Sequence, residues 1–540
     1  MTSNSKKTRI VFIILLIAQV CLYVYTFSQK NAFLTDEFYT YGLSNSYYKP
    51  FLCSDGWHSY KNNVWLTGAD FKYYLRTNKD TNFKFDSVIS NLSKDTTPPL
   101  YYLALHAVSS VFTGYFSWWW SFWINIFCFI AAQILLYKIF DDPLHPSKLP
   151  LYICGFWGFT LSALYPVVYV RMYSMLDMFV FLYIYLLKRC MQKQSLVIKD
   201  FFLILSAVIL GGLTHYLFFL FAFFYTGCCC VYLLLKKHFK MLALTAFSAL
   251  SGVLAAFLLF PAAARNIFAP LMVWKSQETF LYKFYMIFRL AAADITGIKL
   301  PYDMPDAVTA VLIIIIAALS VFAVIKFIKN GTPYVVFVFI SSAAYFVYIC
   351  NKTAYEQFGI AIDRYIFVVL PLFIGCAAVF SRRLISGMPK YAKYAAAALL
   401  FISAASQNIF CFKPYAEHFN SANGSINKYV VNKNCIMIEP LEIYLPSYGK
   451  MLENARNVFV TSHNGGMFLD EKYDLAKEYE KIYSGQDCFY VAVDMLNLNE
   501  DSINYGVLPY FSGISGYTPT FCTNEKVQGS EVRLYRFDRE

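Results

Sequence analysis

The stretch LTDEFY, residues 34–39, places two adjacent carboxylates shortly after the first long apolar run of the chain, residues 10–27. A run of this length is long enough to cross a membrane as a helix. Because adjacent side chains point in different directions on a strand or a helix, Asp36 and Glu37 are not expected to share one proton. We expect one of them to face a reaction centre and the other to hold the loop or a second substrate group. The alternative is that they only mark the water boundary.

The composition places the chain in a membrane. Of its 540 residues, 58% are hydrophobic, 19% are aromatic and only 15% are charged. Soluble domains carry about 25% charged residues, so a polytopic membrane protein is indicated. The net charge of +12 is spread over short clusters between apolar runs, and we see no nucleic-acid signal. No Cys or Cys/His metal spacing is present, so no cofactor is indicated and a divalent-metal requirement is left undecided.

The apolar runs predict a mostly α fold, a membrane helix bundle of about eleven spans in residues 1–411. The bundle carries two long outer loops, residues 29–115 and 261–305. Residues 412–540 are turn-rich, and short apolar runs there predict strands in an extra-membrane α/β domain. The expected strands are 435–438, 458–461, 488–493 and 532–537. After the first span, the others are expected at 116–137, 150–169, 173–190, 201–215, 217–235, 241–260, 306–325, 333–350, 364–380 and 394–410.

The basic clusters predict the orientation. Residues 100–112 are expected to lie in the interface, because every later basic cluster then falls on one side, the cytoplasm. The N-terminus is then cytoplasmic, and the outer face receives both long loops and the C-terminal domain. The inner clusters are Lys138 and Lys148; Lys188, Arg189 and Lys193; Lys236, Lys237 and Lys240; Lys326 and Lys329; and Arg382, Arg383, Lys390 and Lys393.

Polar residues on the outer face form a candidate site, because ionisable groups gathered at one membrane boundary indicate function. A carboxylate base beside several cations suits a displacement in which a phosphate leaves. Arginine suits the phosphate because its planar fork binds two oxygens at once. The candidates are Asp36, Glu37, Asp95, His106, Arg171, Tyr173, His215, Arg364 and Tyr365.

Each candidate also has a structural alternative. His106 lies on an apolar helix and is more often a buried histidine there than a catalyst. Arg171 and Arg364 could be interface anchors whose stems lie along apolar surface, and His215 could hold two spans together. The Pro98-Pro99 pair could only break a helix. Five such elements in order on one face favour a site.

Several of these motifs, taken together, resemble a family of membrane enzymes. In order, they look like those of the C-type (GT-C) integral-membrane glycosyltransferases, and closest to the protein O-mannosyltransferase and lipid A aminoarabinose transferase group. The resemblance covers about residues 1–385. The family often has His before the Pro-Pro pair, where this chain has Thr97. The motifs are Asp36-Glu37, DTTPPLYY (95–102) with His106, RMYS (171–174), THY (214–216), and Arg364-Tyr365 with Pro371.

The resemblance implies transfer of a sugar, with inversion, from a polyprenyl-phosphate carrier to an acceptor hydroxyl or phosphate on the outer face. Asp36 matches the catalytic aspartate and Glu37 its acidic neighbour, while Arg364 matches the residue that binds the lipid phosphate. The partners would be this donor, a lipid, glycan or protein acceptor, and membrane lipids. The expected substrate-binding residues are Asp95, Tyr101, His106, Arg171, Tyr173, His215, Arg364 and Tyr365.

The expected location is the bacterial inner membrane, with the active site and the C-terminal domain in the periplasm. A transporter or flippase for a lipid-linked glycan is the alternative function. Against it, the charges crowd one face instead of the bilayer midplane, and no paired broken-helix repeat is visible in the sequence. A non-catalytic scaffold would leave the outer carboxylates and arginines without a purpose.

Overall fold

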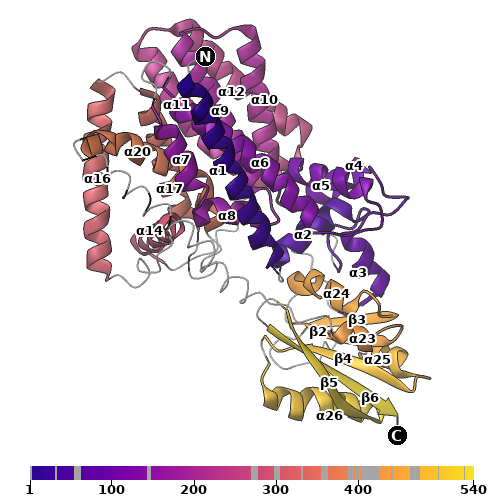
Figure 1. Ribbon diagram of the computed structural model, residues 1–540. Helices are drawn as coiled ribbons and strands as arrows, with labels where there is room; N and C mark the ends of the chain where they lie inside the picture. The colour runs from indigo at the N-terminus through magenta and orange to yellow at the C-terminus, as the bar shows by residue number, and fades with distance from the viewer. Residues whose placement is uncertain are drawn as a thin grey trace. The chain divides into compact units, whose positions relative to one another are not determined.

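A computed structural model of the chain divides into two compact units, which we call the helical unit and the sheet unit (Figure 1). The helical unit comprises Met1–Phe27, Thr97–Tyr101 and Ser121–Phe412, and the sheet unit comprises Ser28–Thr96, Tyr102–Trp120 and Lys413–Glu540. The structure describes residues 3–30, 33–53, 63–142, 147–268, 278–296, 305–329, 333–353, 355, 363–386, 389, 391, 395, 398, 402, 425–439, 442–462, 475–496, 498–527 and 530–539.

The helical unit is built from helices. Its helices are α1 (Ser3–Ser28), α6 (Trp119–Phe140), α7 (Leu149–Trp157), α8 (Leu161–Val168), α9 (Tyr173–Lys193), α10 (Ile198–Thr214), α11 (Leu217–Leu235), α12 (Phe239–Leu259), α13 (Ala262–Phe268), α14 (Phe280–Thr296), α16 (Asp306–Lys329), α17 (Pro333–Lys352), α19 (Asp363–Ile366), the 3₁₀ turn η2 (Phe367–Val369) and α20 (Leu370–Ser386). Helix α14 lies within the second long loop, residues 261–305, and packs against α17 and α8.

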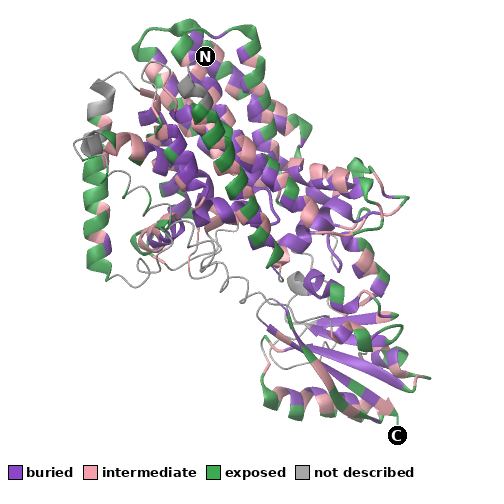
Figure 2. Cartoon of the chain, viewed as in Figure 1, coloured by how far each residue is buried: buried purple, intermediate pink, exposed green. Residues whose placement is uncertain are grey.

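Six helices among the described residues are long and apolar enough to cross a membrane, or seven if the bent pair α7 and α8 counts as one span. Large apolar side chains are exposed on two of these helices, α1 and α12, and also on the shorter apolar helix α16 (Figure 2): Ile14 is 58% exposed, Leu258 72% and Ile314 66%. Exposed apolar surface of this extent suits contact with lipid. The chain is an integral membrane protein, and the predicted mostly α fold is confirmed.

The predicted count of about eleven spans stays a prediction. Helices α9 and α10 coincide with two further expected spans, and the expected span 394–410 falls almost entirely outside the described residues. The interfacial segment expected at 100–112 is a helix, α5 (Leu100–Val111).

The span expected over residues 150–169 is broken into α7 and α8, which are bent by 56°. A break leaves carbonyl oxygens that need donors inside a membrane. The Tyr23 hydroxyl supplies one by donating to the Gly158 carbonyl at 2.8 Å. A Cβ on Gly158 would lie 2.2 Å from the amide of Gln19, so only glycine lets α1 approach the break this closely. The break directs the end of α8 toward the turn before α9.

The sheet unit combines the first loop with the C-terminal residues. From the loop come α2 (Thr35–Asn45), β1 (Val64–Leu66), α3 (Gly68–Leu75), α4 (Phe85–Ser93) and most of α5. From the C-terminal part come α23 (Ser425–Tyr429), β2 (Asn434–Glu439), the 3₁₀ helix η3 (Glu442–Tyr448), α24 (Gly449–Leu452), β3 (Asn457–Ser462), α25 (Leu475–Tyr483), β4 (Cys488–Asp494), the π-helix η4 (Ser502–Val507), α26 (Leu508–Ser515), β5 (Tyr517–Val527) and β6 (Ser530–Arg539).

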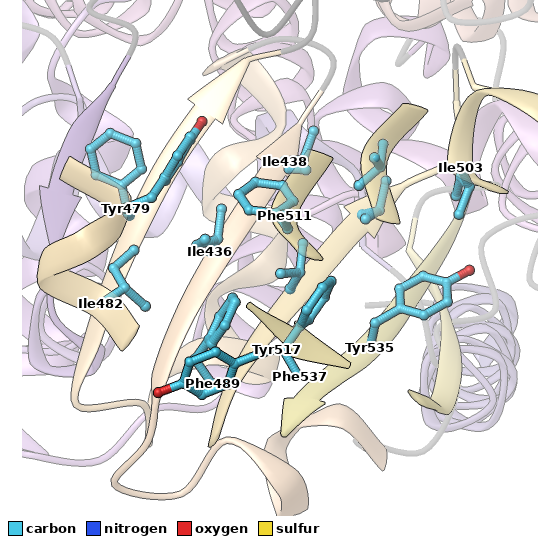
Figure 3. Packing of buried hydrophobic residues seen from close by; sticks show 14 residues of the cluster. Ile436, Ile438, Tyr479, Ile482, Phe489, Ile503, Phe511, Tyr517, Tyr535 and Phe537 are labelled. Carbon is cyan, nitrogen blue, oxygen red and sulfur yellow. The ribbon is translucent and has the colours of Figure 1, made fainter. Parts of the chain in front are cut away.

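Among the described residues, the sheet has six strands in the order β1-β3-β2-β4-β6-β5, with β2, β3 and β4 parallel. Parallel strands are buried on both faces, which explains the apolar runs that predicted them. Helices α25 and α26 cover one face, where Ile436, Tyr479, Phe489 and Phe511 belong to one buried cluster (Figure 3). The predicted C-terminal α/β domain is confirmed, and β2, β3, β4 and β6 lie at the expected strands.

The first loop and the C-terminal sheet are one structural unit. Strand β1 extends the sheet by pairing antiparallel with β3, so that Val64 lies opposite Val460. Helix α3 begins against the same sheet, because the Gly68 amide donates to the Ala455 carbonyl at 3.2 Å. A Cβ on Gly68 would lie 2.5 Å from that oxygen, so the contact requires glycine. The domain boundary expected between residues 411 and 412 lies outside the described residues.

Candidate functional site

Helix α2 carries the two candidate carboxylates in its first turn, where a negative charge is favourable. The helix is buried from Glu37 onward. Gly42 lies against the ring of Tyr74, which would be 2.1 Å from a Cβ at that position. At its other end, the Asn45 amide donates to the Leu75 carbonyl at 2.9 Å. These contacts fix the middle and the end of α2 to α3.

The side chain of Glu37 is fully buried and holds the loop. Its carboxylate forms an ion pair with Lys30, whose side chain is also buried, and accepts the Leu34 amide at 2.7 Å. Burial lowers the pKa of Lys30, and the neighbouring Glu37 carboxylate opposes that shift. Asp36, the next residue back, is only half-buried. The two neighbours therefore have different surroundings, as expected for residues that point in different directions.

A Glu37→Gln variant is expected to destabilise the first loop. The change removes the charge opposite Lys30, and breaking a buried ion pair from one side costs about 3–5 kcal/mol. Amide hydrogen exchange of residues 28–45, measured on the full-length protein in detergent, should therefore become faster. The matched control is Glu500→Gln, which breaks an ion pair between Arg533 and an exposed carboxylate and should change little. Equal protection in the Glu37 variant and the parent would contradict this role.

His106 and Asp95 also lie in the sheet unit. His106 is buried on α5 with its ring 5.4 Å from that of Phe85, and burial lowers its pKa. This is the packing position that the structural alternative predicted, and a substrate contact for His106 stays a prediction. Asp95 is buried just after α4, where its amide donates to the Leu92 carbonyl at 3.2 Å.

In the helical unit, the other candidates meet at helix ends. Arg364, in the short helix α19, donates to the hydroxyls of Tyr169 and Tyr365, each at 3.2 Å. Its guanidinium also lies over the Tyr365 ring, 5.0 Å from the centroid. Tyr169 stacks on Tyr173, the first residue of α9, with centroids 5.8 Å apart. The aromatic rings therefore orient the Arg364 fork.

His215 joins this cluster from the connection between α10 and α11. Its ring centroid is 5.7 Å from that of Tyr173. Burial, together with the charges of Arg171 and Arg364, lowers the pKa of His215 to about 3. The imidazole is therefore neutral at physiological pH. Because its Nδ1 accepts the Leu217 amide at 3.1 Å, its Nε2 carries the proton and can act as a donor.

Arg171 lies two residues before Tyr173, the residue whose ring centroid is 5.7 Å from that of His215. Arg171 is buried in the turn between α8 and α9. That turn is held in part by Asn125, whose amide donates to the Tyr169 carbonyl at 2.9 Å. Two arginines and a neutral imidazole N–H form an arrangement that suits an anion such as a phosphate. We call Arg171, Tyr173, His215, Arg364 and Tyr365 the arginine cluster.

Ten site residues were predicted, and they fall in the two units. The five residues of the arginine cluster come together in the helical unit. Tyr101 also belongs to that unit, where its hydroxyl is hydrogen-bonded to Ser121. The remaining four belong to the sheet unit. They are Asp36, Glu37, Asp95 and His106.

Three further residues of these surroundings were not among the predicted site residues. Tyr169 is a partner of Arg364, and Lys30 is the partner of Glu37. Asp294 is buried on α14, and burial together with nearby Asp363 raises its pKa well above the usual range. The only signals in the sequence that could have pointed to these residues were the positions of Lys30, six residues before Asp36, and of Asp363, the neighbour of Asp294, directly before Arg364.

Among the residues that the structure describes, no group of three or more His, Cys, Asp or Glu side chains is placed to hold a metal ion.

The fold is of the GT-C type, as the motifs predicted. Two crystal structures share it over almost the whole chain. ArnT from Cupriavidus metallidurans bound to undecaprenyl phosphate matches with a TM-score of 0.52 and 9% sequence identity, covering 97% of this chain and 97% of that chain. The same protein in the apo state matches with a TM-score of 0.53 and 9% identity, covering 98% of each chain.

A weaker match is the archaeal oligosaccharyltransferase AglB from Archaeoglobus fulgidus, in complex with an inhibitory peptide and a dolichol-phosphate. Its TM-score is 0.46 at 9% identity, covering 91% of this chain and 70% of that chain. A TM-score below 0.5 does not establish a common fold. No family model matches the sequence, and no curated protein matches it.

Proposed function

We propose that this protein transfers a sugar from a polyprenyl-phosphate-linked donor to an acceptor hydroxyl or phosphate. The reaction inverts the anomeric configuration, and Asp36 is the general base. In the proposed orientation, the site and the C-terminal domain face the periplasm of a bacterial inner membrane. The lipid, glycan or protein acceptor and the identity of the sugar are left to experiment.

The proposed step balances as a single displacement. Asp36 takes the proton of the acceptor hydroxyl, and the acceptor oxygen attacks the anomeric carbon. The bond from that carbon to the phosphate oxygen breaks, and the polyprenyl phosphate leaves with the electron pair. Arg364 and Arg171 stabilise the negative charge that grows on the leaving phosphate, because preorganised charges act most strongly where charge develops.

The arginine cluster carries this proposal. Arg364 is held by two tyrosine hydroxyls, and Arg171 is buried in the turn that contains one of these tyrosines, Tyr169. Such a site favours a phosphate over a neutral sugar. The surroundings of Asp36 support the base, since Glu37 is committed to Lys30 while Asp36 is half-buried. Binding of undecaprenyl phosphate by the ArnT of similar fold adds support for the donor class.

A transfer assay tests the reaction. Purified full-length protein is incubated with undecaprenyl-phosphate-linked pentoses and hexoses and with a membrane extract as acceptor, and mass spectrometry follows release of undecaprenyl phosphate. The same method compares lipids and glycans of cells with and without the gene, and cells without it should accumulate the donor and lack one sugar on the acceptor. A transporter would change the side on which the lipid-linked glycan lies while leaving every sugar linkage intact. One bent helix pair is found among the described residues, whereas transporter repeats have two.

The orientation is tested separately. We predict a cytoplasmic N-terminus and an external C-terminus, because basic clusters collect in the loops that this arrangement places inside. Alkaline phosphatase is active only outside the cytoplasm, so it should be active when fused after Glu540. Green fluorescent protein fused at the same position should not fluoresce. The opposite result would overturn the proposed orientation and the one-sided site.

A further inference from the structure

A segment of the C-terminal domain touches the first turn of the helix that carries the proposed base. The 3₁₀ helix η3, which follows β2 of the sheet, packs against α2. The Ser447 hydroxyl lies 3.4 Å from the hydroxyl of Thr35, the first residue of α2. Asp36 is the next residue along the chain. A segment about 400 residues away in sequence therefore helps to set where this turn lies.

The sheet fixes η3 through a buried carboxylate. Asp494 is the last residue of β4 and is 5% exposed. It accepts hydrogen bonds from the hydroxyl of Tyr448, the last residue of η3, and from the hydroxyl of Ser530 at the start of β6. The Leu496 amide also donates to it, at 2.8 Å. A buried carboxylate needs such donors, so Asp494 links η3 to two strands.

The same sheet also holds the first loop by other contacts. Arg76, which follows α3, forms an ion pair with Glu453 at 2.9 Å. The Thr461 hydroxyl donates to the side-chain oxygen of Asn63 at 2.8 Å, next to the pairing of β1 with β3. These contacts hold the loop to the sheet before β1 and after α3, and α2 packs on α3. Because α3 holds the middle and the end of α2, the contact with η3 acts on its first turn, which carries Asp36.

We infer that the C-terminal domain positions the general base, and that Ser447, Tyr448 and Asp494 are positioning residues for Asp36. The inference rests on the proposed function and assigns the C-terminal domain a part in the chemical step. A misplacement of about 1 Å in a reacting group can cost about 10²-fold in rate. These residues touch neither donor nor acceptor in this scheme, so their effect should appear in kcat and not in donor binding.

The main variant is Tyr448→Phe, which removes one hydroxyl and keeps the ring. In the transfer assay, kcat should fall by about 10- to 100-fold, with KM for the donor within about twofold. The matched control is Tyr483→Phe, which removes a hydroxyl that donates to the Ile514 carbonyl at 3.0 Å in the same domain, away from η3. Its kcat should equal that of the parent. Unchanged kcat in Tyr448→Phe, or an equal loss in both variants, would overturn the inference.

If Tyr448→Phe does not fold, smaller changes at Ser447 test the same inference. Ser447→Ala should lower kcat, and Ser447→Thr, which keeps the hydroxyl, should restore it. A role in general packing predicts no such rescue, so failure of Thr to restore kcat would count against positioning.

The effect should also depend on Asp36. In an Asp36→Asn background the base is already lost, so adding Ser447→Ala should not slow residual transfer further. An equal fold-loss in both backgrounds would mean that Ser447 acts elsewhere, and the inference would fail. If Asp36→Asn alone keeps full activity, the assignment of Asp36 as the general base fails, and the inference fails with it. If Asp36→Asn is inactive while the η3 variants are fully active, only the positioning role is wrong.

Discussion

Replacing Asp36 by asparagine is expected to slow sugar transfer by about 10²–10⁴-fold, the usual cost of losing a positioned base. Asparagine is nearly isosteric with aspartate but cannot accept the acceptor proton. Since the arginine cluster is untouched, the variant should bind undecaprenyl phosphate as tightly as the parent does. The rate is measured in the transfer assay, and binding is measured with undecaprenyl phosphate alone by native mass spectrometry in detergent.

The matched control for Asp36 is Asp86→Asn. Asp86 is a carboxylate of the same loop, in the first turn of α4, where it accepts the Tyr48 hydroxyl. Its loss should leave the rate of transfer unchanged. Glu37→Gln should act mainly through loop position, because its carboxylate is engaged with Lys30. If Asp36→Asn kept most activity and Glu37→Gln abolished it, the two roles would be exchanged. If neither variant changed the rate of transfer, neither carboxylate would be the general base.

The sequence was sufficient for the parts of the fold that depend on composition and burial. Membrane helices can be recognised in the sequence as long apolar runs, because lipid surrounds them. Strands β2, β3 and β4 can be recognised as short apolar runs, because both of their faces are buried. The expected spans 150–169 and 201–215 end near the ends of α8 and α10, and the expected span 364–380 begins near the start of α19, because Arg171, His215 and Arg364 interrupt apolar runs. Polar residues at helix ends are visible in sequence.

Contacts between distant segments were not predictable in the same way. Strand β1 has only three residues, and nothing in them indicates pairing with Val458–Val460 nearly 400 residues later. The break between α7 and α8 depends on Gln19 and Tyr23 of another helix. The sequence of residues 150–169 alone therefore predicted one unbroken span. Tyr169 carried no signal, because it is one of 44 tyrosines. The link from η3 to α2 is a contact of the same long-range kind.

Replacing Arg364 is expected to weaken binding of the carrier phosphate. Arg364→Ala removes a charged fork, and hydrogen bonds to charged groups contribute about 1.5–3 kcal/mol each. Affinity for undecaprenyl phosphate should therefore fall by about 10²-fold. Arg364→Lys keeps the charge but cannot bind two oxygens at once, so a loss of about 10-fold is expected. Titration by native mass spectrometry measures both, and undecaprenol, which lacks the phosphate, reports binding of the lipid chain alone.

The comparison that isolates the phosphate contact uses two further variants. Arg382→Lys alters an exposed arginine at the far end of the same helical segment and should leave affinity unchanged. Tyr169→Phe removes the hydroxyl that accepts from Arg364 at 3.2 Å, so the fork should lose orientation while keeping its charge. Its loss of affinity should be smaller than that of Arg364→Lys. If Arg364→Ala binds undecaprenyl phosphate as the parent does, the arginine cluster is not the phosphate site. If Arg364→Ala weakens undecaprenol binding equally, Arg364 supports the fold of the lipid site and not the recognition of its charge.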